Sequence, residues 1–378
     1  MLIAQGPQPM FNVDYETLMA KQFGNSRYLY QQGDGTIVDK SCCPTSSPPI
    51  GTAMWVALTA ATSSNSILYS PDGVSWYPSN GSFDFGGGGV TYAAGKWVAV
   101  GGSVTKTIQY STDGINWNDT SGSSFTGTGG GGYGLSVAYG GGTWVAVGTS
   151  DISGLTTILW SPDGITWQDG SGGYFGISIF SFSNGTGVAY GTDGSGEPLW
   201  VAVGTADVSG RTILHSADGR TWVDAIGANF TDIGYSVAYG GGKWVATGYY
   251  DGSGHTLLWS DDGTYWNDAS GVQILDVNNG IPISGIDYGA DNSGIPLWVA
   301  TGHGLNGHTI LNSRDGMNWY NAEGAPFASG YGIDVAYGDK WVAVGTGIVH
   351  SPDGYTWTPG IGGGGGYVTG VATNGCHI

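Results

Sequence analysis

The chain has little cationic charge and few cysteines, and it contains no long apolar run. Six Lys and four Arg stand against 29 acidic residues, which gives a formal net charge of −19. Nucleic-acid binding needs a basic footprint that displaces counterions, so this composition argues against it, and against adhesion to anionic membranes. No stretch approaches 18 consecutive apolar residues, so we expect no membrane insertion.

Signals for export, metal binding and disulfide scaffolding are also missing. The opening residues MLIAQGPQPMF lack the charged region and long apolar core of a Sec signal, so we expect synthesis in the cytoplasm. The three cysteines, Cys42, Cys43 and Cys376, are too few for a disulfide framework, and no Cys/His spacing indicates zinc. We therefore expect neither a metal nor a cofactor.

Glycine and aromatic residues are abundant instead. The chain has 73 Gly, and 13% of its residues are aromatic against 10% charged. Glycine costs about 1 kcal/mol relative to alanine in a helix interior, whereas Trp, Tyr and Val favour strands and Gly suits tight turns. The composition predicts an all-β protein.

Two motifs alternate along the chain. Ser-x-Asp-Gly-x-x-Trp occurs seven times, with its carboxylates at Asp72, Asp113, Asp163, Asp218, Asp262, Asp315 and Asp353. Trp-Val-Ala also occurs seven times, beginning at Trp55, Trp97, Trp144, Trp200, Trp244, Trp298 and Trp341. Together they account for fourteen of the sixteen Trp. Such internal repetition indicates a repeat architecture.

Each repeat contains four short apolar runs. In the third repeat they are 136–140, 143–148, 156–161 and 165–169. Each run is rich in β-formers and bounded by turn residues, and Asp-Gly between the third and fourth is a strong hairpin signal. Four antiparallel strands repeated radially are typical of propeller blades, so the sequence predicts a seven-bladed β-propeller.

The two ends of the repeat region complement each other. Residues 51–60 open the first repeat directly with its second strand, and one unmatched strand, 367–375, follows the last repeat. We predict that this C-terminal strand completes the first blade and closes the ring, which argues against an open solenoid and hides the sheet edges. Cys376 is then expected near Cys43, and a disulfide between them is a hypothesis that counting free thiols by mass spectrometry tests.

The seven Ser-x-Asp-Gly-x-x-Trp boxes resemble the Asp-box (bacterial neuraminidase-type) repeat family, over residues 51–378. That family includes sialidases, sortilin-type receptors and photosystem assembly factors, so the resemblance implies a fold and leaves the function open. In one departure, the family's common box has a residue between Asp and Gly, whereas here the two are adjacent.

We expect no enzymatic activity and no catalytic residues. The resemblance implies that a sialidase holds its substrate carboxylate with three arginines, and here Arg211 alone is a candidate. Arg27 precedes the repeats, and Arg220 and Arg314 lie in the boxes. No nucleophile elbow, phosphate loop or zinc-protease motif occurs. The box carboxylates are expected to accept amide hydrogen bonds within their turns, a structural role.

Ligand-binding candidates lie in the loops between second and third strands, which share one face with the connections between blades. Asp151, Asp207 and Asp251 each open an Asp-x-Ser-Gly segment, which fits a calcium or sugar-hydroxyl site and equally a plain Asx turn. A basic arc, for an acidic glycan or a partner carboxylate, is formed by Lys106, Arg211, His255 and His308. The alternative is charge balance against Asp207 and Asp251.

Aromatic residues recur in the connections between blades. They are Phe83, Phe125, Phe175, Phe230 and Phe327. Exposed, they would stack on sugars or contact a protein; buried, they would pack between blades.

Residues 1–50 lie outside the repeats and form a separate N-terminal extension. A short helix over 14–24 and a hairpin over 27–39 are predicted, followed by a linker-like stretch at 41–49. The extension is either a cap on the propeller or an anchor to another protein.

We interpret the chain as a non-enzymatic structural or adhesion protein that displays a propeller for protein or glycan binding. A virus or phage particle component, on a virion or an extracellular surface, is the leading setting. A free glycan-binding module and an intracellular assembly scaffold are the alternatives.

Overall fold

The computed structural model describes most of the repeat region and two short segments before it. The described residues are 29–31, 37–39, 55–60, 66–126, 131–150, 157–176, 183–207, 209–249, 256–271, 283–302, 309–323, 327, 330–362 and 367–374. The chain divides into two compact units, Met1–Ser47 with Cys376–Ile378, and Pro48–Gly375. In the first unit, β1 (Leu29–Gln31) pairs antiparallel with β2 (Ile37–Asp39), where the sequence predicts a hairpin. The predicted helix over 14–24 and all three cysteines lie outside the described residues.

The second unit is built entirely of strands within its described part. The innermost strands are β6 (Gly87–Ala93), β11 (Gly132–Gly140), β16 (Ser183–Thr192), β21 (Gly234–Gly240), β26 (Ile283–Ala290), β30 (Gly332–Tyr337) and β35 (Val368–Thr373). The second strands are β3 (Trp55–Thr59), β7 (Lys96–Ser103), β12 (Thr143–Ser150), β17 (Pro198–Gly204), β22 (Lys243–Gly248), β27 (Pro296–Gly302) and β31 (Trp341–Gly345).

The two outer positions of each sheet are occupied by shorter strands. The third strands are β4 (Ile67–Ser70), β8 (Ile108–Ser111), β13 (Ile158–Ser161), β18 (Ile213–Ser216), β23 (Leu257–Ser260), β28 (Ile310–Ser313) and β32 (Ile348–Ser351). The outermost strands are β5 (Ser75–Pro78), β9 (Trp117–Asp119), β14 (Thr166–Asp169), β19 (Thr221–Asp224), β24 (Tyr265–Asp268), β29 (Asn318–Asn321) and β33 (Thr358–Pro359).

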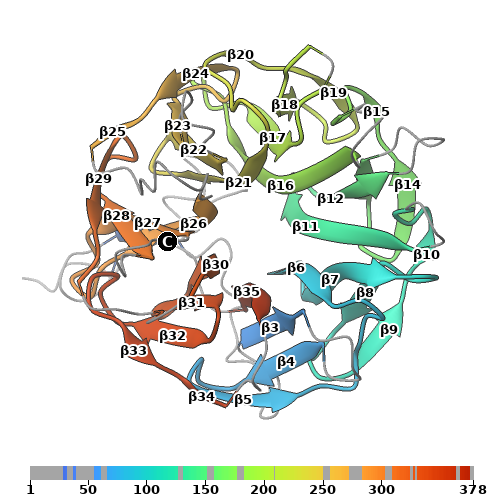
Figure 1. The fold of residues 1–378 in the computed structure, drawn as a ribbon, viewed down its shortest axis with the longest axis horizontal. Helices are drawn as coiled ribbons and strands as arrows, with labels where there is room; N and C mark the ends of the chain where they lie inside the picture. The colour runs from blue at the N-terminus through green and yellow to red at the C-terminus, as the bar shows by residue number, and fades with distance from the viewer. Residues whose placement is uncertain are drawn as a thin grey trace, which may run out of the picture. The chain divides into compact units, whose positions relative to one another are not determined.

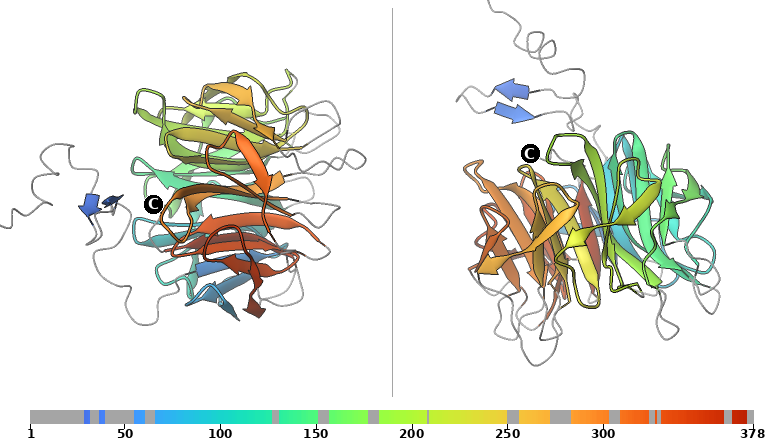
Figure 2. Two further views of the ribbon diagram at one scale, coloured as in Figure 1. Left: turned by 90° about the vertical axis from the view of Figure 1, so that its left-hand side faces the viewer. Right: turned by 90° about the horizontal axis from the view of Figure 1, so that it is seen from above.

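These strands form antiparallel meanders that stand around a central axis, with the innermost strands nearest the axis (Figure 1). Seen from the side, the turns between strands lie on two opposite faces of this unit (Figure 2). The arrangement is a β-propeller, as the sequence predicts.

The Trp-Val-Ala motif forms the second strand and supplies the core. Its seven tryptophans are at most 2% exposed. In β12, Trp144 pairs with Tyr139 of the innermost strand, and the two rings lie 4.9 Å apart between centroids. The same pairing recurs in other sheets, with centroid distances of 4.8 to 5.0 Å. An aromatic pair adds about 0.5–1.5 kcal/mol to the burial of its apolar area. The buried clusters extend between neighbouring sheets: Trp144, for example, packs with Val98 and Val100 of the preceding sheet.

The C-terminal strand pairs with the first strand of the repeat region. β35 lies antiparallel to β3, with Trp55 opposite Thr373 and Ala57 opposite Val371. The sheet order is β34-β5-β4-β3-β35, where β34 (Ile361–Gly362) pairs in parallel with β5. Residues from the end of the chain therefore flank both edges of this sheet.

Short parallel strands, which the sequence analysis does not predict, link neighbouring sheets at the rim. They are β10 (Ser121–Gly122), β15 (Ser171–Gly172), β20 (Ile226–Gly227), β25 (Ser270–Gly271) and β34. β10, for example, pairs with β14 of the following sheet. The glycine of this segment needs a left-handed conformation, with φ of +87° at Gly122, and a side chain there would meet the backbone of Trp167.

The glycines that open β6 permit close contact between innermost strands. A Cβ atom at Gly88 would lie 2.2 Å from the carbonyl oxygen of Gly134 in β11. No residue with a side chain fits there without moving the backbone.

Candidate binding face

The box carboxylates accept hydrogen bonds from groups within their own turns. Asp262 Oδ1 accepts hydrogen bonds from the amides of Thr264 and Tyr265, both at 2.8 Å. It also accepts one from the hydroxyl of Ser260 at 3.1 Å, while that hydroxyl oxygen accepts from the amide of Gly263 at 2.8 Å. Burial opposes ionisation of Asp262, but these hydrogen bonds outweigh it and hold its pKa below the ordinary value.

The same hydrogen bonds recur in every box. The serine-to-carboxylate distances run from 2.9 to 3.1 Å at Asp72, Asp113, Asp163, Asp218, Asp262, Asp315 and Asp353. These hydrogen bonds stabilise each hairpin and engage Oδ1 of its carboxylate.

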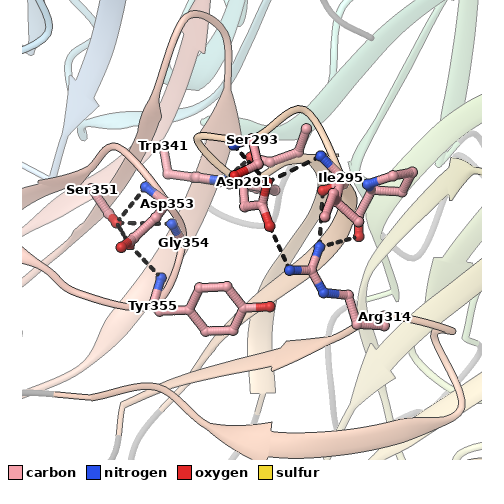
Figure 3. A network of polar contacts seen from close by, with 11 residues as sticks. Asp291, Ser293, Ile295, Arg314, Trp341, Ser351, Asp353, Gly354 and Tyr355 are labelled. Carbon is pink, nitrogen blue, oxygen red and sulfur yellow. Dashed lines mark hydrogen bonds and ion pairs between the residues drawn. The ribbon is translucent and has the colours of Figure 1, made fainter.

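The Asp-x-Ser-Gly segments form Asx turns. Asp207 Oδ1 accepts from the amides of Ser209 and Arg211, both at 2.8 Å. Asp291 Oδ1 accepts in the same way from Ser293 at 2.8 Å and Ile295 at 3.0 Å, as Figure 3 shows. Because Asp291 lies between an innermost and a second strand, on the face opposite to Asp207, the motif makes the same turn in two settings. Asp151 and Asp251 lie outside the described residues.

The predicted basic arc is described at two of its four positions, and there it points to the rim. Arg211 forms an ion pair with Asp224 at 2.9 Å, not with Asp207. Lys106 donates from its ammonium to the carbonyl oxygen of Thr120 at 3.2 Å. His255 and His308 lie outside the described residues. The described part of the arc thus makes contacts within its own sheets.

Two further arginines are also held by the chain. Arg314 donates to the carboxylate of Asp291 and to the carbonyl oxygens of Ile295 and Pro296 (Figure 3). The guanidinium carbon of Arg220 lies 4.1 Å from the ring centroid of Trp160. Arg27, the fourth, lies outside the described residues.

The recurring phenylalanines pack between sheets. The five of them are at most 3% exposed. Phe83 is fixed by a hydrogen bond of 2.6 Å from its amide to the hydroxyl of Ser66, and Phe125 by one of 3.0 Å to Thr107. Their burial leaves no ring free to stack on a sugar.

A different set of aromatic residues is exposed on the face that carries the connections between sheets and the loops between second and third strands. Two ring pairs occur there, Phe85 with Tyr133 at 5.8 Å and Tyr331 with Tyr367 at 6.2 Å between centroids. Their exposed fractions are 38, 40, 42 and 51% in the order named. We call these four residues the aromatic face. The sequence analysis misses them, because they stand in glycine-rich stretches just before or at the start of innermost strands.

The two pairs belong to consecutive sheets. The carbonyl oxygen of Tyr367 accepts a hydrogen bond of 2.8 Å from the amide of Ala60. A Cβ atom at Gly86, the residue after Phe85, would lie 2.9 Å from the Cα atom of Ala60. Ala60, itself exposed, therefore lies between Tyr367 and Gly86, at the boundary of the two neighbouring sheets that carry Tyr367 and Phe85.

Strand pairing fixes the first ring pair. Tyr133 pairs with Gly102 at the end of β7, and the amide of Phe85 donates to the carbonyl oxygen of Gly102 at 2.9 Å. A Cβ atom at Gly102 would lie 2.2 Å from the ring of Tyr133 and 2.9 Å from Cβ of Phe85. Both residues of the pair are therefore held against the backbone of Gly102.

One carboxylate lies beside this pair. Asp84 Oδ2 accepts from the hydroxyl of Ser103 at 2.7 Å and from the amide of Val104 at 3.1 Å. The Ser103 hydroxyl, with help from the Val104 amide, lowers the pKa of Asp84, which is therefore ionised at neutral pH.

Within the described residues, no group of three or more His, Cys, Asp or Glu is arranged to hold a metal ion. The described part of the chain also contains no helix that is long and apolar enough to cross a membrane.

No protein-family model and no curated protein sequence matches this chain. Solved structures similar to it include YCF48 bound to a D1 peptide, at 14% identity over 88% of this chain and 94% of that chain, with a TM-score of 0.48. YCF48 from Cyanidioschyzon merolae matches at 14% identity over 81% of this chain and 95% of that one, with a TM-score of 0.47. A catalytically inactive virginiamycin B lyase from Staphylococcus aureus, with quinupristin, matches at 8% identity over 72% and 83%, with a TM-score of 0.49.

Proposed function

We propose that this chain is a non-catalytic β-propeller that binds a protein partner through the aromatic face. The observation that carries the proposal is the two exposed ring pairs on consecutive sheets, of which Phe85–Tyr133 is held by strand pairing and a backbone hydrogen bond. Aromatic residues are enriched in protein interfaces, since a pinned ring buries much apolar area at little entropic cost. The box turns and the buried phenylalanines stabilise the fold, whereas the two ring pairs of the aromatic face are exposed to solvent.

We further propose that the propeller has seven blades of the Asp-box type and is closed by β35. The seven sequence repeats support the blade number, and the common hydrogen-bond pattern of the boxes supports the type. The pairing of β3 with β35 supports the closure. A closed ring exposes no sheet edge, which suits a protein displayed on a surface.

Library selection tests the binding face. We expect peptides selected on the full-length protein from a displayed random library to lose roughly tenfold in affinity for a Phe85→Ala/Tyr133→Ala variant, because truncation of a buried interface ring typically costs 1–2 kcal/mol or more. Isothermal titration calorimetry measures the loss.

The control is Tyr320→Ala, which removes a more exposed ring from the outermost strand β29. Equal losses in both variants would contradict binding at the aromatic face. A parallel glycan array covers the alternative: glycan hits that depend on these rings, without peptide hits, would make the chain a lectin-like module.

We propose that residues 1–50 attach the propeller to a larger assembly, such as a virus or phage particle. The segment lies outside the repeats that a propeller needs, which supports an attachment role over a part in the fold. We expect the full-length chain to associate in solution and a chain beginning at Gly51 to be monomeric, as measured by light scattering. Two stable monomers would contradict self-association through this segment. Recovery of the protein in purified particles, against its recovery in cell fractions, separates the particle role from an intracellular scaffold.

A further inference from the structure

Four partly buried aromatic rings in the outer part of the sheets and their turns have cationic partners within the chain. Cationic groups lie over the rings of Tyr110, Trp160, Trp259 and Tyr355, at 4.1 to 5.7 Å from the ring centroids. These cations are Lys96, Arg220, Lys243 and Arg314. A positive charge over a ring face is attracted by the ring quadrupole, so these four rings have cationic partners within the molecule.

The pair Phe85 and Tyr133 differs from these four rings in having no cationic partner within the described part of the chain. Among the described residues, no cation lies over either ring. The two lysines nearest in sequence have other partners: Lys96 lies over the ring of Tyr110, and Lys106 donates its ammonium to the carbonyl oxygen of Thr120. The ring pair packs against Gly102, and both residues are more than a third exposed.

Two sources of negative charge act on these rings: the carboxylate of the adjacent residue Asp84 and the net charge of the whole chain. Asp84 precedes Phe85, and its carboxylate is fixed by Ser103, which is itself paired with Gly132, the residue before Tyr133. At longer range, the net charge of −19 attracts cationic partners and repels anionic ones. Rings with a fixed carboxylate beside them are suited to an alkylammonium or guanidinium group, which gains from both.

We propose that the aromatic face binds a cationic segment of a partner protein, with a Lys or Arg side chain over the Phe85–Tyr133 pair and its charge against Asp84. This rests on the proposed function, since it names the partner chemistry of the same face. Tyr331 and Tyr367 extend the surface along which the rest of the segment lies. A neutral sugar would stack on the rings and donate hydroxyl hydrogen bonds to the carboxylate, but it would gain no charge pairing with it.

The test compares two nonapeptides that differ only in charge, Ac-GSKGKSKGS-NH2 and the same peptide with every lysine acetylated. We expect the lysine peptide to bind the full-length protein and the acetylated peptide to bind at least about fivefold more weakly, with affinity falling as salt rises. Phe85→Leu and Tyr133→Leu keep apolar bulk but remove the ring, and each is expected to weaken lysine-peptide binding about twofold to fivefold. Asp84→Asn is expected to weaken it by a similar factor.

The controls are Tyr320→Leu and Asp169→Asn, which alter an exposed ring and an exposed carboxylate on the outermost strands. Unchanged affinity in both is expected. A loss with Asp169→Asn equal to that with Asp84→Asn would overturn the proposal, because the binding would then follow net charge alone. So would equal affinity for both peptides, or no binding at millimolar concentration.

Failure of this proposal is distinguishable from failure of the proposed function. If library-selected peptides without Lys or Arg bind the face and lose affinity in Phe85→Ala/Tyr133→Ala, the face binds protein and the cationic preference is wrong. If no peptide depends on these rings, both proposals fail.

Discussion

A chain that ends at Gly362 is expected to lose its cooperative unfolding transition and to aggregate. The truncation removes β35 and leaves the backbone groups of β3 unpaired along one edge. It also removes Val368 and Val371, which are at most 4% exposed and pack in one cluster with Trp55. Burial of one such side chain contributes about 1.5–3 kcal/mol. The total loss, with the strand pairing, approaches the 5–15 kcal/mol by which a domain is typically stable.

β35 also connects its sheet to both neighbours. The hydroxyl of Thr369 donates to the carbonyl oxygen of Gly87 at 2.6 Å, and the amide of Val371 donates to the carboxylate of Asp334 at 3.0 Å. Its removal therefore weakens three sheets together. An exposed edge strand is in addition a template for association between chains.

Circular dichroism melts and sedimentation check this prediction. A chain that ends at Gly375 retains β35 and is expected to unfold like the full-length protein. A synthetic peptide of residues 366–375 is expected to restore the transition of the chain that ends at Gly362. An unchanged melting temperature after removal of β35 would show that this strand does not hold the structure together.

The sequence predicts the repeating part of the fold because each repeat reports its own local physics. Asp-Gly needs a positive φ, which is +72° at Gly263 and nearly the same in the other boxes. The Trp of each Trp-Val-Ala motif lies on a buried second strand, as its continuous run of apolar residues indicates. Repetition turns seven weak local signals into one strong one. The missing first strand and the surplus last strand then predict the pairing of β3 with β35.

The aromatic face is not predictable in this way, because it depends on contacts between sheets. Tyr133 owes its place to pairing with Gly102, which lies in the preceding sheet. No periodicity within one repeat encodes that register. Phe83, only two residues before Phe85, is buried, so exposure cannot be assigned from residue type either. The short parallel strands do leave a signal: a Gly follows the Trp of every box by five residues, and in these strands it is Gly122, Gly172, Gly227, Gly271 and Gly362.

Stability is expected to fall as pH rises through neutrality, because two carboxyls join neighbouring innermost strands. Asp287 Oδ2 accepts from the amide of Tyr337 and Oδ1 from the amide of Tyr288, both at 2.8 Å. Asp334 accepts from the amide of Val371 in β35. Burial raises the pKa of each to about 7 against these hydrogen bonds, and the charge of Asp287 adds to the effect on Asp334.

The sign follows from proton linkage. Between the ordinary pKa of 3.8 and about 7, the folded state binds protons that the unfolded state releases. This contribution to stability is complete below the ordinary pKa and is lost as pH rises through about 7. The box carboxyls act in the opposite direction, since their pKa values are lowered, to about 2 at Asp315. Their contribution is complete above the ordinary pKa and is lost as pH falls toward the folded value. We therefore expect maximal stability at mildly acidic pH.

Melting temperatures from pH 3 to pH 9 measure both limbs. Asp334→Asn is expected to flatten the neutral limb, because an amide oxygen still accepts from Val371 but carries no charge. Asp287→Asn is expected to act in the same way, since each carboxylate accepts from the amide of the residue that follows it and from an amide of the neighbouring innermost strand. Asp262→Asn serves as the matched control: it is expected to alter the acid limb and to leave the slope near pH 7 unchanged. The same slope near pH 7 in Asp334→Asn as in the unaltered protein would show that this carboxyl does not govern the neutral limb.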